Sequence, residues 1–131
     1  MGDRPILSHI LERIEALEGL DAAVIITNAR FAPDFSTWKS TYTGRLPISI
    51  LDDGTTTAET RLGALADLRL ALAHEPPDAD GLLVVAGDNL LEFDLEEAHR
   101  HFCDTGRPTL VVRQREPEAP GPSRYNAVSI D

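Results

Sequence analysis

The chain has 131 residues, of which 22 are acidic and 12 are basic, so its formal net charge is −10. A chain of this length can form one domain with a buried core, and its negative charge argues against nucleic acid and anionic membrane surfaces as partners. It has no apolar run of membrane-spanning length and no signal-peptide pattern at its N-terminus. We therefore expect a single cytoplasmic domain over residues 1–131.

Helical and strand patterns alternate along the first half of the chain. Apolar residues recur at helical spacing from Ile6 to Leu17, where Gly19 follows, and this pattern predicts a helix. Residues 22–27 are apolar and β-branched without strict alternation, which predicts a strand covered on both faces, as in a parallel sheet. A second helix and then a strand at 48–51 are predicted next. This helix carries four aromatic residues on one stripe, which we expect to pack in the core: Phe31, Phe35, Trp38 and Tyr42.

The same alternation continues in the second half of the chain. A polar loop at 52–57 leads into a third helix with regularly spaced leucines: Leu62, Leu65, Leu68 and Leu72. A fourth helix is predicted over 95–103, with its end near Gly106. Three further segments have strand patterns: 82–86, 109–112 and 125–130. Helices that alternate with buried strands predict a three-layer α/β domain with a mostly parallel sheet.

Polar residues follow the predicted strands, where open parallel sheets bind their ligands. Asn28 ends one strand, and Gly54 lets a backbone amide approach a ligand closely. The threonines at 55–57 leave free amides at the start of the next helix, which would favour an anion. Asp88 follows an apolar strand pattern and a glycine, so it is placed either to hold Mg²⁺ or to be the N-cap of the segment that follows. These clusters could equally be ordinary polar loops.

For other residues that could take part in catalysis or metal binding, we expect structural roles instead. Cys103 is the only cysteine, which excludes an internal disulfide and a cysteine-based zinc site, and we expect it to be an inert core thiol. His99 and His101 lie two positions apart in a predicted helix, so they point to different faces and form a poor metal pair. The chain has no Gly-x-Gly pair, no P-loop and no lysine except Lys39. This excludes a dinucleotide fingerprint, a P-loop nucleotide site and a phosphoacceptor receiver domain.

Three runs of the sequence are similar to one enzyme family. DAAVIITNARFAPDFSTW, LPISILDDGTTTAETRLGALADL and GLLVVAGDNLLEFDL resemble the sugar-phosphate nucleotidyltransferases, which join a nucleoside triphosphate (NTP) to a sugar 1-phosphate and release pyrophosphate. The opening RPILSHILERIEAL looks like the helix after that family's N-terminal signature, and SRYNAVSID like a later strand. The resemblance implies a three-layer α/β/α, Rossmann-like core with a mostly parallel sheet.

The resemblance also implies roles for individual residues. Asp88 matches the aspartate that binds the catalytic Mg²⁺, and Gly54 matches the glycine whose backbone borders the nucleotide base. Residues Thr55 to Thr57 depart from the commoner version of this loop, which has a small residue and a glutamine, and this leaves the base preference open. Asn28 matches a strand end that faces the site. NTP and a sugar phosphate are the partners implied, and Mg²⁺ is the cofactor implied. A homo-oligomer is left open.

The family's triphosphate-binding loop and first strand have no counterpart here, nor does the C-terminal part with the second metal-binding aspartate. We therefore expect an internal portion of the catalytic domain, which is inactive when isolated. In the family, the first strand lies between the counterparts of 22–27 and 82–86, so its absence would leave two unpaired inner edges. The alternative is a non-catalytic relative of the same fold that binds nucleotide or sugar phosphate or serves a regulatory role.

Overall fold

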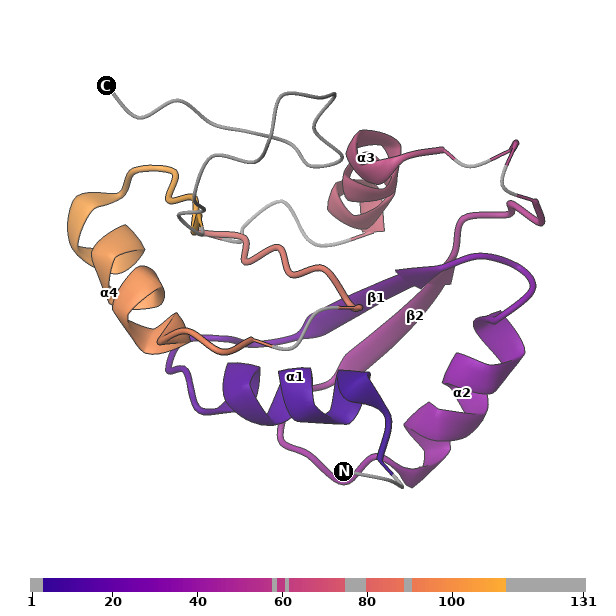
Figure 1. Cartoon of the computed structure of the whole chain (residues 1–131), viewed down its shortest axis with the longest axis horizontal. Helices are drawn as coiled ribbons and strands as arrows, with labels where there is room; N and C mark the ends of the chain where they lie inside the picture. The colour runs from indigo at the N-terminus through magenta and orange to yellow at the C-terminus, as the bar shows by residue number, and fades with distance from the viewer. Residues whose placement is uncertain (1–3, 58, 61, 75–79, 89–90, 113–131) are drawn as a thin grey trace, which may run out of the picture. The chain divides into compact units, whose positions relative to one another are not determined.

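The computed structural model describes residues 4–57, 59–60, 62–74, 80–88 and 91–112, which fall into two compact units, 1–92 and 93–131. The first unit holds three helices and two strands, and the second holds one helix, so the chain is a small α/β protein (Figure 1). The elements are α1 (Ile6–Glu15), β1 (Ala23–Thr27), α2 (Ala32–Thr41), β2 (Ile48–Asp52), α3 (Ala64–His74) and α4 (Leu95–Thr105). None of the helices in the described ranges has the length and apolar character that crossing a membrane requires.

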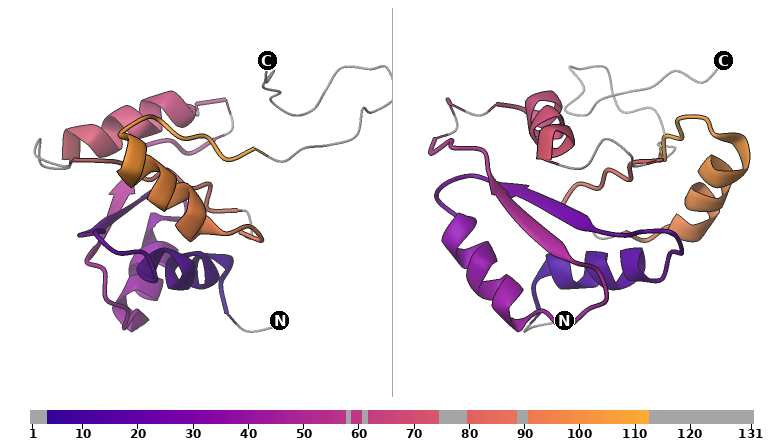
Figure 2. Two further views of the ribbon diagram at one scale, coloured as in Figure 1. Left: turned by 90° about the vertical axis from the view of Figure 1, so that its left-hand side faces the viewer. Right: turned by 180° about the vertical axis from the view of Figure 1, so that it is seen from behind.

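β1 and β2 form a parallel pair, which is the only sheet in the described part of the chain. Their register runs from Ala23 opposite Ile48 to Thr27 opposite Asp52, so both strands end at the same edge. α2 makes the crossover that parallel strands require. α1 and α2 lie on one side of the strand pair and α3 lies on the other (Figure 1, Figure 2).

α1 forms where the apolar spacing predicted it, and it buries Ile10 and Leu11. It ends two residues before Leu17, which is itself buried. Carbonyl groups at a helix end need donors from elsewhere. Here the Arg45 guanidinium donates to three carbonyl oxygens at the end of α1 and just beyond it: Leu20 at 3.0 Å, Leu17 at 3.2 Å and Glu15 at 3.3 Å.

The aromatic stripe of α2 is not the core face that the sequence predicted, because none of the helix's residues is buried. Phe31 is exposed, and the Arg30 guanidinium lies 5.2 Å from its ring centre. Trp38 and Tyr42 are half-buried, and the polar atoms of both side chains have hydrogen-bond partners, as is usual for buried tryptophan and tyrosine. The Trp38 indole donates to the Ser8 hydroxyl on α1 at 3.2 Å, and the Tyr42 hydroxyl donates to the Glu15 carboxylate.

α3 follows Gly63, whose φ of +82° suits a glycine. The helix contacts β1, yet none of its residues is fully buried. Leu65 is 80% exposed and Leu72 is 55% exposed, although the predicted leucine spacing is that of a covered face. A helix was therefore predicted correctly in this region, but it begins at Ala64, so Leu62 lies before it, and a large part of its leucine surface is open in the structure.

Two predicted strands are absent from the described structure. Residues 82–86 and 109–112 are irregular and make no strand pairing. In 82–86 the exposure alternates from residue to residue, as in an extended segment with one side uncovered, and Val84 is 68% exposed. A strand needs a partner, and among the described residues β1 pairs with β2 alone, so the structure does not show these two strands. The predicted strand at 125–130 lies outside the described residues.

α4 organises the second unit. Its N-cap residue, Asp94, accepts hydrogen bonds from the Glu96 and Glu97 amides at 3.0 and 3.4 Å, and Gly106 ends it with a φ of +63°. The predicted helix is therefore confirmed, two residues longer at its C-terminal end than expected. Cys103, which the sequence predicted to lie in the core, is exposed on this helix.

Candidate functional site

The carboxyl edge of the β1–β2 pair brings three of the four predicted site residues together. The Asp53 amide donates to the Thr27 carbonyl at 2.9 Å, and the Ala29 amide donates to the Thr55 carbonyl at 3.0 Å. These two hydrogen bonds hold the loop 53–55 against the end of β1, where Asn28 lies. Asn28, Gly54 and Thr55 therefore share one edge of the sheet, as the order of parallel strands predicts.

The loop after β2 is fixed by its own aspartates. An Asp52 carboxylate oxygen accepts from the Gly54 amide at 2.8 Å, and an Asp53 oxygen accepts from both the amide and the hydroxyl of Thr55 at 2.7 Å. Thr55 is only 6% exposed, which makes it the one buried polar residue among those described. Gly54 has a φ of +75°, and a Cβ added to it would have no atom within 4 Å. Gly54 is thus an open backbone corner on a rigid loop.

Two of the three threonine amides already have hydrogen-bond partners, and α3 begins only at Ala64, so these threonines do not form the helix start with free amides that the sequence predicted. The Thr55 amide is bonded to Asp53, and the Thr57 amide donates to the Thr60 hydroxyl at 3.2 Å. Aspartate and threonine side chains compete in this way for nearby backbone donors. The loop instead presents carboxylate and hydroxyl oxygens, which accept hydrogen bonds.

Asn28 lies at the carboxyl edge of the strand pair and also has a structural role. Its side-chain oxygen accepts from the Phe31 amide at 3.1 Å, and its carbonyl accepts from the amides of Phe31 and Ala32 at 3.1 and 3.0 Å. These bonds fix the chain between β1 and α2. Asn28 therefore sets the shape of the rim.

The structure places Asp88 differently from the other three residues. It is exposed and lies in a turn at 87–88. The preceding segment is not a strand, so Asp88 does not stand at a strand end. At the start of α4 the N-cap is Asp94, not Asp88.

A metal ion at Asp88 would need ligands from outside the described part of the chain. Within that part, no three His, Cys, Asp or Glu side chains gather closely enough to hold an ion. Magnesium is commonly bound by one or two carboxylates together with phosphate oxygens and water. The exposed Asp88 carboxylate suits Mg²⁺ on these terms, as one ligand beside the phosphates of a nucleotide.

The structure also contains a buried polar atom that was not predicted from the sequence. Asp67 in α3 has a buried carboxylate oxygen, Oδ1, that has no hydrogen-bond partner among the described residues. A buried acceptor without a donor is costly. Asp67 is the one acidic residue in the otherwise apolar run ALADL, and this feature of the sequence could have indicated a buried carboxylate.

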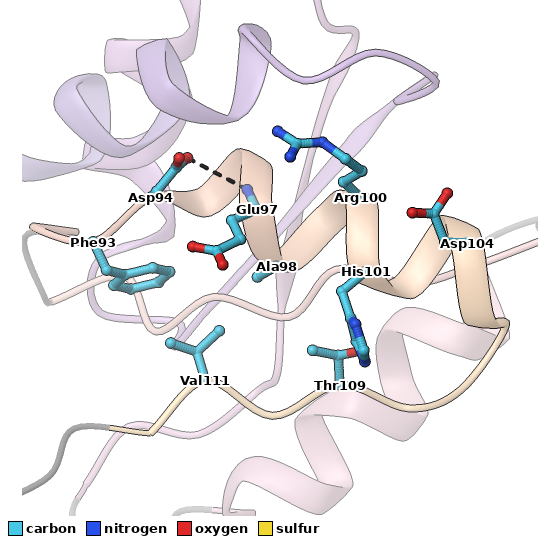
Figure 3. A pocket seen from close by; sticks show the side chains of 9 residues that line it. All are labelled: Phe93, Asp94, Glu97, Ala98, Arg100, His101, Asp104, Thr109 and Val111. Atoms are coloured by element: carbon cyan, nitrogen blue, oxygen red, sulfur yellow. Dashed lines mark hydrogen bonds between the residues drawn. The ribbon is translucent and has the colours of Figure 1, made fainter.

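The second unit has a cavity of about 480 Å³ between α4 and the segment 109–111. Figure 3 shows Glu97 and His101 pointing toward this segment, while Arg100 points away. On another part of α4, the His99 Nε2 lies 3.6 Å from the Cys103 Sγ. The two histidines therefore have different surroundings, as predicted, but the partnership of His99 with Cys103 was missed, although the i, i+4 spacing was visible.

Comparison with known proteins adds no relative: no family model matches the chain, and no curated protein or solved structure matches it either. Membership of the nucleotidyltransferase family is therefore a proposal, and its support comes from the residues and contacts of this chain.

Proposed function

We propose that the protein is a Mg²⁺-dependent, cytoplasmic nucleotidyltransferase that joins an NTP to a sugar 1-phosphate and releases pyrophosphate. The carboxyl edge of β1–β2 binds the base and ribose of the nucleotide. The observation that carries the proposal is the open backbone corner at Gly54, on a loop hydrogen-bonded to the end of β1. The resemblance of the DDGTTT and AGDN runs supports the same assignment.

The chemistry of the loop favours base and ribose over phosphate. A flat base can approach Gly54 closely because there is no side chain in the way. The Asp52 and Asp53 carboxylates keep acceptor capacity for hydroxyl or amino donors, since a carboxylate offers about four lone-pair sites. The occupied amides of Gly54 and Thr55 do not suit a phosphate. We therefore place the phosphates away from this loop, on the side of Asp88.

In this proposal Asp88 would be the ligand that the chain offers to Mg²⁺. When bound, the ion neutralises the charge on the phosphates. In the reaction, a sugar phosphate oxygen attacks the α-phosphorus, the bond to the β-phosphate breaks, and pyrophosphate leaves. Such a displacement needs positioning and charge neutralisation more than covalent help from the protein.

We further propose that the complete fold is the three-layer, Rossmann-like sheet implied by the resemblance, with 82–86 and 109–112 as additional parallel strands. Helices already lie on both sides of β1–β2 (Figure 2). The exposed side chains of Leu82, Val84 and Leu110 would be covered in such a sheet.

A non-catalytic binding or regulatory relative is the second candidate. It is favoured by the place of Asp88 in the structure, which is a turn that does not follow a strand. A protein of this kind would bind nucleotide and release no pyrophosphate.

The first test is calorimetric titration of the whole protein with each NTP in the presence of Mg²⁺. Gly54→Ala should weaken binding at least tenfold, because the methyl group occupies the corner. Gly19→Ala is the matched control, since Gly19 has a φ of +77° and equally open space, so the backbone strain is similar. Equal affinity of the two variants would refute the base site at Gly54.

Pyrophosphate release with a panel of sugar 1-phosphates separates the two candidates. For the enzyme, we expect the full-length gene product to release pyrophosphate in a reaction that depends on Mg²⁺ and falls at least a hundredfold in Asp88→Asn. Nucleotide binding without pyrophosphate release from the full-length gene product would favour the non-catalytic relative.

A further inference from the structure

We infer that the base bound at Gly54 is guanine and that Asp52 is the residue that selects it. This inference rests on the proposed function, because it assigns the base at the same corner of the loop. The Asp52 carboxylate is held beside that corner, since its Oδ1 accepts from the Gly54 amide at 2.8 Å. Asp52 is exposed, so a ligand can reach the carboxylate.

The hydrogen bonds of the loop leave acceptor atoms at this corner. The amides of Gly54 and Thr55 and the Thr55 hydroxyl all donate to aspartate oxygens. Oδ2 of Asp52 takes no part in these bonds, and an ionised carboxylate can only accept. A base that binds beside Gly54 must therefore present hydrogen-bond donors along the edge that faces Asp52.

Guanine is the base whose edge suits a carboxylate. Its N1–H and its exocyclic amino group are adjacent donors, so they can bond to both oxygens of one carboxylate, as the two parallel donors of an arginine do. Adenine and cytosine each have one amino group beside a ring nitrogen that accepts. In uracil, the N3–H lies between two carbonyl oxygens, which a carboxylate repels. A site that bonds to donors rejects ligands that lack them, because its own polar groups are then left unpaired.

Asp53, the neighbouring acidic residue, has a different role. Its Oδ1 accepts from both the amide and the hydroxyl of Thr55 at 2.7 Å, and Thr55 is buried. Asp53 therefore fixes the loop, whereas the exposed Asp52 faces the ligand. Asp53→Asn is the matched control for Asp52→Asn, because it removes the same charge one position away and keeps an acceptor oxygen for Thr55.

The test is calorimetric titration of the whole protein with GTP, ATP, CTP, UTP and inosine triphosphate (ITP), each with Mg²⁺. ITP differs from GTP only in that it lacks the exocyclic amino group. GTP should bind about tenfold or more tightly than each of the others. Asp52→Asn replaces an acceptor with a donor, so it should weaken GTP about tenfold and bring the affinities for GTP and ITP within about threefold. In Asp53→Asn, the preference for GTP over ITP should stay at about tenfold or more.

The nucleotide panel on the parent protein decides the base even if a variant does not fold, which circular dichroism shows. Guanine is wrong if ATP, CTP or UTP binds as tightly as GTP. The role of Asp52 is wrong if Asp52→Asn keeps the preference for GTP over ITP, or if Asp53→Asn loses it equally. In these cases weaker binding by Gly54→Ala would still support the base site, so the inference can fail alone. If no NTP binds, the proposed function and this inference are both refuted.

Discussion

The Glu15 carboxylate joins the end of α1 to the loop before β2. Its Oε1 accepts from the Tyr42 hydroxyl and from the Leu46 amide, the latter at 3.0 Å. A Cβ added to Gly44 would overlap both the Tyr42 hydroxyl and the Glu15 oxygen. The space taken by these two side chains, rather than an unusual φ, therefore favours glycine at position 44.

Gly44→Ala should lower the free energy of unfolding by about 1–2 kcal/mol, the loss of one charge-assisted hydrogen bond. The atoms that the methyl group meets are the ends of flexible side chains, so they move apart and the Tyr42–Glu15 bond breaks. Urea denaturation followed by circular dichroism measures the change. Gly87→Ala is the matched control, because its Cβ would have no atom within 4 Å.

The mechanism predicts that Gly44→Ala and Tyr42→Phe are not additive, since both remove the same bond. The double variant should be about as stable as the less stable single variant. Fully additive losses would show that Gly44 acts through something other than the Tyr42–Glu15 contact.

The same contact gives a pH dependence. Burial and the hydrogen bond to Glu15 raise the pKa of Tyr42 to about 12. A group whose pKa is raised by folding stabilises the protein fully below its unfolded pKa, here about 10, and this contribution is lost as the pH rises toward 12. The difference in unfolding free energy between the parent and Tyr42→Phe should therefore shrink from pH 10 to 12.

At acidic pH, the contribution of Glu15 to stability depends on pH in the opposite direction. The hydrogen bond from Tyr42, followed by that from Leu46, lowers the pKa of Glu15 although burial raises it. The stabilisation from Glu15 is thus complete above its ordinary pKa of 4.5 and is lost as the pH falls through the lower, folded value. Between about pH 5 and 10 the difference between parent and Tyr42→Phe should be flat, and a slope there would contradict the assignment.

Residues such as these mark the limit of what the sequence predicts. Asn28, Gly54 and Thr55 were identified because parallel strand ends share an edge, which is a regular consequence of the fold. The Tyr42–Glu15 contact joins positions 27 residues apart and leaves no periodic signal. The occupied amide of Thr55 depends on which way Asp53 turns, and sequence spacing does not determine that.

At the level of elements, the end of α1 depends on Arg45. Arg45→Lys should cost about 1 kcal/mol, because an ammonium group lacks the rigid fork that reaches the carbonyls of Glu15, Leu17 and Leu20 together. Urea denaturation measures the loss, and faster amide exchange should be confined to the end of α1. Arg30→Lys is the control, since a lysine can keep its place over the Phe31 ring. Equal stability of Arg45→Lys and the parent would show that the contacts contribute nothing.

Helices and strands differ in how far the sequence determined them. The four helices were predicted because their spacing and end signals are local, for example Gly106 after α4. β1 and β2 were also predicted, and the crossover helix brings them together. Residues 82–86 have an equally apolar pattern, yet a strand exists only with a neighbour, and the neighbour is not a property of the segment.

On the scale of the whole molecule, segments that were predicted to be covered also have exposed apolar side chains. Leu65, Val84 and Leu110 are each at least 68% exposed, although they lie in segments whose patterns predict burial. The proposed larger sheet would cover Val84 and Leu110 by bringing both segments between helices.

Hydrogen exchange distinguishes the small sheet from the larger one. Without ligand, amides of β1 and β2 should exchange slowly, and those of 82–86 quickly, because the latter make no ladder hydrogen bonds in the structure. If nucleotide binding completes the sheet, Mg²⁺ and NTP together should slow exchange in 82–86 at least tenfold, and Gly54→Ala should abolish this effect at the same ligand concentration. Tight nucleotide binding that leaves 82–86 unprotected would separate the two proposals, because the base site would then stand while the three-layer sheet would fall.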